Sequence, residues 1–447
     1  MLHPINNNMK YLRALFTISC ILFLANCNRK SKSALISDSE VLHLNEYALT
    51  QVIIYDVFTP PVASRIYSYT ALASYEASRF ADPKYSSIIN KLKGFDKLPK
   101  PEDGKNYNYT LAATKAFFTV ARKVTFSVDS FKKYEDRIYN MYHDNLDDST
   151  YLRSVKFGEE IGKVILKRAA VDNYPQTRSK PKYLGENSPA KWRPTPPDYM
   201  DGVEFCWGTM KQFAIDSSSQ FSPPPPPAYS EDKNSEYVKQ YTAVYNANKN
   251  LTKEQIEIAK FWDDNPFVVM HNGHLMFVDK KITPGGHWIG ITTIACKQTH
   301  ANAVKTAEAY ALTSVALFDA FICCWEVKYH YSYARPVSVI NEKIDNGWLP
   351  LLQTPPFPEY TAGHSTISAA SAAVLTHEFG ENFAFKDTSD LHYIGMQRSF
   401  NSFTKAAEET SISRFYGGIH FLNSSKMGAQ QGDKIGNFIW NKLKTKN

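Results

Sequence analysis

Apolar residues recur at three- and four-residue spacing along most of the chain, which is the pattern of helices with one buried face. Segments 66–76 and 109–118 show it with few glycines between them. The prolines at 60–61 predict a turn or a helix start, and Thr252 with Gln255 predicts a capping box. No run of alternating β-branched residues argues for a sheet, so the pattern predicts an all-α protein.

Composition changes between residues 173 and 229, where prolines accumulate and five stand in a row at 223–227. Prolines stiffen a chain into an extended form, so we expect a strap between two helical halves and not a loose linker. The division we predict is a leader at 1–26, a flexible tether at 27–43, an N-terminal helical bundle at 44–172, the strap at 173–229 and a C-terminal helical bundle at 230–447.

The N-terminus combines a short positive region with an apolar run that is too short for a good transmembrane helix. The run ends in Leu24-Ala-Asn-Cys27, which resembles the lipobox of bacterial lipoproteins, although Asn26 stands where a smaller residue is usual. We therefore predict a lipoprotein signal peptide, a lipidated Cys27 and a location at the periplasmic face of a bacterial membrane. Ordinary secretion with complete release is the alternative.

Composition narrows the function classes. The formal charge of +7 is mild and scattered along the chain, which gives little support to nucleic-acid binding. The 27 tyrosines and 27 phenylalanines supply flat surfaces for helix packing and for lining a pocket. We interpret the cysteines after the leader as buried thiols, with one disulfide as the alternative in an exported protein; they are Cys206, Cys296, Cys323 and Cys324. None of them has a metal-ligand spacing.

Cations gather in the stretch from residue 328 to residue 420. Lys328 and Arg335 are seven residues apart, so on one helix both side chains would leave the same face. Pro336 favours extended geometry at Arg335, which would place this arginine at a helix end. Arg414 adds a second planar set of donors suited to bidentate pairing with an oxyanion. Alone, each of these residues would more often mark a solvated helix face.

Glycine and histidine complete the same stretch. Gly363 lets a backbone N–H approach a ligand with no Cβ in the way, and a strong helix pattern begins at Ser365. His420 can bond to a central atom, and His364 can carry a proton. The ordered combination predicts a pocket for phosphate or its analogue vanadate.

These blocks resemble those of the vanadium-dependent haloperoxidases, which share their pocket with bacterial acid phosphatases and type-2 phosphatidic acid phosphatases. That family reads Lys-x6-Arg-Pro, Pro-Ser-Gly-His and Ser-Arg-x-x-x-Gly-x-His. Here the blocks stand at 328–336, 361–364 and 413–420. The resemblance implies two helical bundles of the vanadium chloroperoxidase or acid phosphatase type, with vanadate as cofactor and phosphate or sulfate as ions able to take its place.

The resemblance also implies residue roles. Lys328, Arg335 and Arg414 would hold the equatorial oxygens, and Gly363 would add a backbone N–H. His420 would bond to vanadium, and His364 would be the acid or base near the apical oxygen. The residues that match or adjoin the pocket lining are Trp325, Phe357, Thr361 and Ala362.

One position departs from the family pattern. Where the family has a serine that hydrogen-bonds the oxyanion, this chain has Ala362. Losing such a bond to a charged group costs on the order of 1.5–3 kcal/mol, so we expect either weaker vanadate binding or a site retuned towards another anion. Thr361 could supply a hydroxyl, although adjacent residues point in different directions.

Three functions fit this pocket. The first is a haloperoxidase that oxidises halide with hydrogen peroxide at histidine-bound vanadate. The second is an acid phosphatase that hydrolyses a phosphate ester through a phosphohistidine at His420. The third is a helical binding lipoprotein whose catalytic pocket has decayed. A histidine-rich patch, with His271, His274 and His287, either overhangs the pocket or consists of surface and core histidines.

Overall fold

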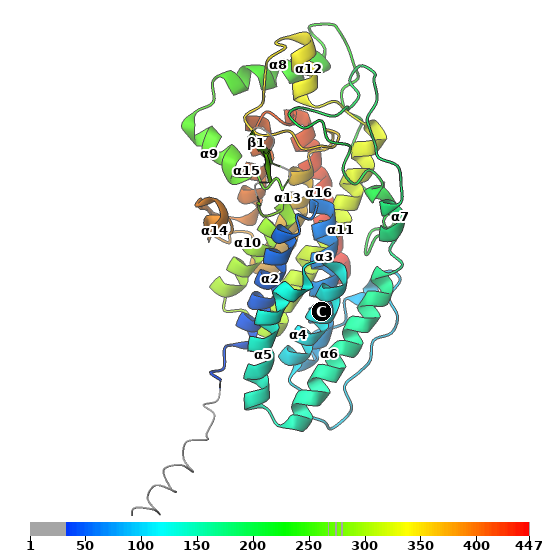
Figure 1. The fold of residues 1–447 in the computed structure, drawn as a ribbon, viewed down its shortest axis with the longest axis vertical. Helices are drawn as coiled ribbons and strands as arrows, with labels where there is room; N and C mark the ends of the chain where they lie inside the picture. The colour runs from blue at the N-terminus through cyan, green and yellow to red at the C-terminus, as the bar shows by residue number, and fades with distance from the viewer. Residues whose placement is uncertain (1–32, 267, 273–274, 279, 447) are drawn as a thin grey trace, which may run out of the picture.

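The computed structural model in Figure 1 describes residues 33–446, with the exceptions of 267, 273, 274 and 279. The predicted leader and Cys27 lie outside these residues. The helices are α2 (Asp38–Tyr55), α3 (Pro60–Ser78), α4 (Tyr109–Val124), α5 (Lys132–Asn145), α6 (Asp148–Ala169), α7 (Tyr174–Arg178), α8 (Glu236–Lys249), α9 (Lys253–Phe261), α10 (Pro284–Gln298), α11 (Ala303–Tyr331), α12 (Pro336–Lys343), α13 (Gly363–Phe379), α14 (Leu391–Ile394), α15 (Phe403–Tyr416) and α16 (Leu422–Leu443). Short 3-10 turns are η1 (Arg79–Ala81), η2 (Ile89–Lys91), η3 (Val128–Phe131) and η4 (Trp207–Thr209), and the strands are β1 (Val269–Asn272), β2 (Leu275–Val278), β3 (Phe385–Asp387) and β4 (Arg398–Phe400).

The all-α fold class is confirmed. The strands form two small antiparallel pairs, β1 with β2 and β3 with β4. No sheet was predicted, because strands of three or four residues are too short to display an alternating pattern. The predicted capping box is present, with Thr252 and Gln255 bonding reciprocally at the start of α9.

Helix α11 is the axis of the molecule. It is 29 residues long and is buried along nearly its whole length. It therefore carries apolar side chains of its own on every face, as is usual for a core helix. By length and composition this helix could cross a membrane, but its apolar window is entirely buried inside the protein, as in a core helix. It packs against α3 from the N-terminal half and against α13 from the C-terminal half (Figure 1).

The two predicted helical halves share one hydrophobic core. A continuous cluster of buried residues runs from Leu42 on α2 to Leu443 on α16. Every residue of α3 is buried, because this helix lies between α4 and α11. The domain boundaries remain a prediction, and they describe segments of the sequence within one packed body.

Helix α2 begins inside the range predicted as a flexible tether. Residues 27–43 were assigned to the tether, yet α2 starts at Asp38. The local reason is a cap: the Ser37 side chain accepts a hydrogen bond from the Glu40 amide, and Asp38 and Glu40 place negative charge at the helix N-terminus. The ordered bundle therefore starts earlier than the composition suggested.

The proline-rich segment is tied to α11 and to the C-terminal half. The Asp319 carboxylate of α11 accepts hydrogen bonds from the amides of Phe213, Ala214 and Ile215. Farther along, the Tyr360 hydroxyl donates to the Pro224 carbonyl at 2.5 Å. These hydrogen bonds fix the segment to α11 and to the loop before α13, and the strap at 173–229 remains a prediction.

Helix α16 holds the start of α13 in place through three glycines. A Cβ added at Gly432 would lie 1.9 Å from the Thr366 carbonyl oxygen, and one at Gly428 would lie 2.7 Å from that of Ala362. A Cβ at Gly436 would lie 2.3 Å from the Ala370 carbonyl oxygen. Only glycine allows this close approach, which fixes the N-terminal turn of α13 where the predicted Gly363 and His364 stand.

Candidate active site

Three separate parts of the chain bring the predicted site residues together. Lys328 comes from the end of α11, and Arg335 from the residue before α12. Gly363 and His364 open α13. Arg414 lies in the last turn of α15, and His420 lies just before α16. The three cations have no exposed surface, and His420 is 2% exposed.

Lys328 and Arg335 do not share a helix, contrary to the prediction from their spacing. Helix α11 ends at Tyr331, and Ser332 adopts a left-handed conformation with φ of 49°. Arg335 is extended, with φ of −74° and ψ of 151°, as Pro336 requires of the residue before it. The turn at Ser332 reverses the chain, and this turn brings the two cations to the same site.

The Lys328 ammonium is occupied by backbone carbonyls. It donates to the carbonyl oxygens of Pro358 at 2.8 Å, Glu359 at 3.1 Å and Thr361 at 2.5 Å. These three acceptors match the three N–H donors of an ammonium group. Lys328 therefore fixes the loop before α13, and its predicted contact with the oxyanion remains a prediction.

Arg335 and Glu359 determine the protonation of His420. Arg335 Nη1 lies 3.1 Å from His420 Nε2, and Glu359 Oε1 lies 2.9 Å from His420 Nδ1. Guanidinium nitrogens only donate, so Nε2 accepts and Nδ1 carries the proton that it donates to the carboxylate. The lone pair of His420 Nε2 therefore points toward the guanidinium group of Arg335.

Arg414 and His364 form a second pair. Arg414 Nη1 lies 3.2 Å from His364 Nε2 and donates to the Asp263 carbonyl at 3.4 Å. The His364 ring is also hydrogen-bonded to the Asp263 backbone. The same carbonyl group therefore positions both the arginine and the predicted proton carrier.

Burial and positive charge govern the titration of this site. Burial, followed by the charges of Arg335 and Lys328, lowers the pKa of His420 well below its usual value. Burial and the Arg414 charge do the same to the pKa of His364. Both imidazoles are therefore neutral at ordinary pH, and the site carries excess positive charge that an anion would balance.

The same burial acts on the cations. It lowers the pKa of Arg335 and of Arg414 to about 10, and that of Lys328 to about 7. It also raises the pKa of Glu359 to about 7. Burial therefore disfavours the charged forms of Lys328, Arg335 and Arg414. A bound anion would stabilise these charged forms.

The donor set fits a small tetrahedral oxyanion. Among the described residues, Nη2 of Arg335 and Nη2 of Arg414 are buried donors without a hydrogen-bond partner. Helix α13 begins here with no side-chain cap from Ala362, so its first amides are available at a positive helix end. A Cβ on Gly363 would lie 3.4 Å from the Trp325 ring. Vanadate, phosphate and sulfate all present the oxygens that such donors bind.

The predicted substitute for the missing serine hydroxyl is engaged elsewhere. Thr361 Oγ1 donates to Gln431 Oε1 at 3.1 Å, and the Thr361 carbonyl binds Lys328. Ala362 is fully buried. The hydroxyl of Thr361 is therefore committed to α16.

Aromatic rings lie beneath the cations. The rings of Trp325 and Phe357 are 5.0 Å apart. Lys328 Nζ is 5.1 Å from the Phe357 ring centre, and the Arg335 guanidinium carbon is 5.0 Å from it. Electron-rich ring faces stabilise buried positive charge, so both predicted lining residues help to hold the cations.

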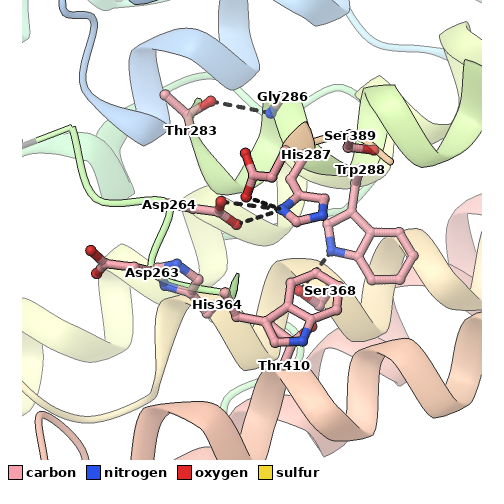
Figure 2. Close-up of polar contacts among 12 residues, drawn as sticks. Asp263, Asp264, Thr283, Gly286, His287, Trp288, His364, Ser368, Ser389 and Thr410 are labelled. Atoms are coloured by element: carbon pink, nitrogen blue, oxygen red, sulfur yellow. Dashed lines mark hydrogen bonds and ion pairs between the residues drawn. The ribbon is translucent and has the colours of Figure 1, made fainter. Parts of the chain in front are cut away.

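Next to Asp263 lies a cluster of four buried side chains, and Figure 2 labels two of them, Asp264 and His287. We call Asp264, His287, Asp387 and Asp390 the aspartate–histidine cluster. His287 Nδ1 lies 3.0 Å from Asp264 Oδ2, and its Nε2 lies 2.9 Å from Asp387 Oδ2. Burial alone would lower the pKa of His287, but the surrounding aspartates raise it well above its usual value. His287 is thus a buried imidazolium.

The aspartate–histidine cluster anchors a wall of the site. Asp264 follows Asp263, whose carbonyl binds Arg414 and the His364 ring. The His287 ring also stacks on Trp262 with a centroid separation of 4.5 Å. The core interpretation therefore holds for His287, whereas His274 and the side chain of His271 lie outside the described residues.

Glu359 is the site residue that sequence reasoning could have found. It stands inside the block from Phe357 to Ser365 and is its one acidic residue. Its carboxylate also accepts the Phe421 amide at 2.9 Å. Asp263 and Asp264 carried no such signal, because they lie far from the blocks in sequence.

The chain resembles known proteins both in sequence and in structure. The family model described as VCPO second helical-bundle domain matches residues 308–446. The chain is similar in structure to a bacterial vanadium-dependent iodoperoxidase, with a TM-score of 0.86, 41% identity and coverage of 92% of this chain and 98% of the other. No curated protein sequence matches.

Two further structures are of a bacterial vanadium-dependent chloroperoxidase. The holo form has a TM-score of 0.67 and 17% identity, covering 87% of this chain and 93% of the other. The apo form has a TM-score of 0.65 and 15% identity, covering 86% and 93%. At these identities the likeness concerns the fold alone.

Proposed function

The chain belongs to the vanadium-dependent haloperoxidases, and on that premise we propose that the halide it oxidises is iodide. The support is the 41% identity with a bacterial iodoperoxidase over 98% of that protein. Hydrogen peroxide is the oxidant in this reaction. The two other functions considered from the sequence, a phosphatase and a decayed binding protein, are not favoured by these comparisons.

One observation carries the assignment of the metal ligand. His420 keeps its proton on Nδ1, held by Glu359, and directs the lone pair of Nε2 to the guanidinium side of the site. An imidazole binds a metal centre through such a lone pair, while a carboxylate on its other nitrogen fixes the tautomer. His420 Nε2 would therefore bond to vanadium in place of the hydrogen bond that it accepts from Arg335 Nη1.

The arginines would bind the oxygens of the anion. Nη2 of Arg335 and Nη2 of Arg414 are buried donors with no partner among the described residues, and the Gly363 amide lies at the start of α13. Vanadate bound there would supply an electron-poor centre that makes hydrogen peroxide susceptible to attack by halide. The guanidinium groups increase this effect because they withdraw electron density through their hydrogen bonds.

His364 would move the proton. Its ring is neutral because burial and Arg414 lower its pKa, so Nε2 can accept a proton from hydrogen peroxide in place of the hydrogen bond from Arg414. The Asp263 carbonyl holds the ring in place beside Arg414. Lys328 acts differently, since its bonds to three carbonyls shape the loop that carries Glu359.

We also propose that the protein is exported and anchored through a lipid on Cys27. The support is the sequence alone, from the positive region to the Cys27 motif. Mass spectrometry of the membrane fraction would test it, since Cys27→Ser should move the protein from that fraction to the soluble one. Equal membrane association of both forms would contradict lipidation.

The activity is tested on purified protein stripped of anions. Orthovanadate is added back, and iodide, bromide and chloride oxidation by hydrogen peroxide is followed beside hydrolysis of a phosphate monoester. We expect vanadate-dependent oxidation of iodide in preference to the other halides. Faster turnover of bromide than of iodide would overturn the iodide assignment, and ester hydrolysis without any halide oxidation would favour the phosphatase.

A further inference from the structure

A second cavity lies away from the predicted oxyanion site. It has a volume of about 440 Å³ and is walled by α2, by α10 and by residues 388–393. Leu44, Ile289 and Ile294 give it an apolar lining. This volume falls within the range of small-molecule sites, which combine an apolar wall with a few polar groups.

The polar group inside this cavity is Glu46 of α2. Its residue is 4% exposed, and its Oε2 atom has no hydrogen-bond partner among the described residues. Burial raises the pKa of Glu46 to about 8, and no positive side chain offsets that burial. A buried carboxyl without a counter-ion is costly to ionise, so it favours a ligand that brings positive charge.

Several polar groups around Glu46 already have partners, whereas Ser389 Oγ, like Glu46 Oε2, has none among the described residues. Thr50 Oγ1 lies 2.9 Å from the Tyr67 hydroxyl, and the Tyr310 hydroxyl lies 2.7 Å from both His43 Nδ1 and Thr293 Oγ1. Burial lowers the pKa of His43 to about 4, so its ring is neutral. The remaining titratable groups facing the cavity are Glu40 and Tyr47 on α2, Lys297 on α10, and His392 and Tyr393 on α14.

Lys297 does not serve as the counter-ion. Its Nζ lies 2.9 Å from Glu40 Oε2, and both side chains are about half exposed. The two charges therefore neutralise each other in solvent-accessible positions. Glu40 therefore has a counter-ion, whereas Glu46 has no opposite charge in the cavity.

We propose that this cavity binds a small primary ammonium ion with an apolar body, with the Glu46 carboxylate as its counter-ion. The ammonium would donate to Glu46, and the apolar body would lie along Leu44, Ile289 and Ile294. Pairing with a buried carboxylate stabilises both charges, because each replaces the water that the other has lost.

This site is separate from halide oxidation. Gly286, Gly290 and Lys297 line the cavity from α10, whereas His287 of the same helix belongs to the aspartate–histidine cluster. Trp288 also lies outside the cavity lining, and its indole N–H donates to Ser368 Oγ on α13 at 2.7 Å (Figure 2). Occupation of the cavity therefore does not require vanadate.

The first test is calorimetric titration of the whole protein with benzylamine, benzyl alcohol and benzoate. We expect benzylamine to bind and the other two to bind at least about tenfold more weakly, because only benzylamine carries an ammonium group. Below about pH 8, Glu46 must lose a proton when the ammonium binds, so titrations in buffers of different ionisation heat should report proton release. Equal binding of benzyl alcohol, or no binding of benzylamine, would overturn the proposal.

Variants then locate the binding. Glu46→Gln should weaken benzylamine binding by about 30-fold or more and abolish the proton release. Glu159→Gln, at an exposed ion pair on α6 away from the cavity, is the control and should leave both unchanged. Leu44→Trp should block the cavity while Glu46 stays intact, and retained halide oxidation would show that each variant is folded. Unchanged benzylamine affinity in Glu46→Gln would refute the assigned counter-ion.

Discussion

Arg335 Nη1 lies 3.1 Å from His420 Nε2, and this contact decides which nitrogen of the imidazole carries the proton. Since the guanidinium can only donate, the proton is on Nδ1, where Glu359 accepts it at 2.9 Å. All three side chains are buried. The predicted metal ligand is thus set in a single tautomer by a carboxylate that the family motifs do not include.

Glu359→Gln should weaken vanadate binding by about ten- to a hundredfold, because the carboxylate orients the His420 ring and raises its basicity. Orthovanadate titration of the stripped protein, followed by iodide oxidation, measures this affinity. Glu342→Gln is a suitable control, since Glu342 pairs with Arg193 away from the site. Equal vanadate affinity in Glu359→Gln and the native protein would mean that the carboxylate does not act on the ligand.

Ala362→Ser should raise vanadate affinity by about tenfold or more, because it restores a hydroxyl donor at a fully buried position of the site. The same position is the N-cap of α13, where a serine hydroxyl could instead accept a backbone amide. Vanadate titration and thermal unfolding of the same variant separate the two uses. A higher melting temperature with unchanged affinity would show that the hydroxyl serves the helix.

His287→Gln should destabilise the protein by about 3–5 kcal/mol, because it removes the cation from a group of buried carboxylates. Its loss should also release the Asp263 carbonyl from its position beside His364, so iodide oxidation should slow more than vanadate binding weakens. Urea unfolding and the separate measurement of kcat and vanadate affinity test both effects. Glu159→Gln, at an exposed ion pair on α6, is the control. Unchanged stability of His287→Gln would show that the aspartate–histidine cluster does not anchor this wall of the site.

Glu46→Gln should change how stability depends on pH. The pKa of Glu46 is raised from 4.5 to about 8 in the folded protein, so between these values the folded state keeps a proton that the unfolded state releases. This difference lowers the free energy of unfolding as pH rises, by about 1.4 kcal/mol per pH unit, and the loss is complete above pH 8.

The variant should lack that component of the pH dependence, so its advantage over the native protein grows from about pH 5 to about pH 8. Urea unfolding at several pH values measures it, with Glu40→Gln as the comparison. Parallel pH profiles for native protein and Glu46→Gln would show that the carboxyl titrates normally.

Local patterns in the sequence were sufficient for the fold class and the family. Helix periodicity depends on neighbours three and four residues away, so it is visible without a structure. The blocks from Lys328 to Pro336 and from Ser413 to His420 are equally local. Their order predicted a shared site, and the structure does bring Arg335 beside His420 and Arg414 beside His364. The individual roles of these residues in catalysis remain predictions.

Only the tertiary structure decided which groups hold the site residues in place. The spacing of Lys328 and Arg335 suggested one helix face, but the turn at Ser332 separates them onto two elements. Thr361 could have offered its hydroxyl to the anion, yet Gln431 of α16 takes it. The orientation of a loop side chain depends on partners that lie far away in the sequence, and periodicity carries no information about them.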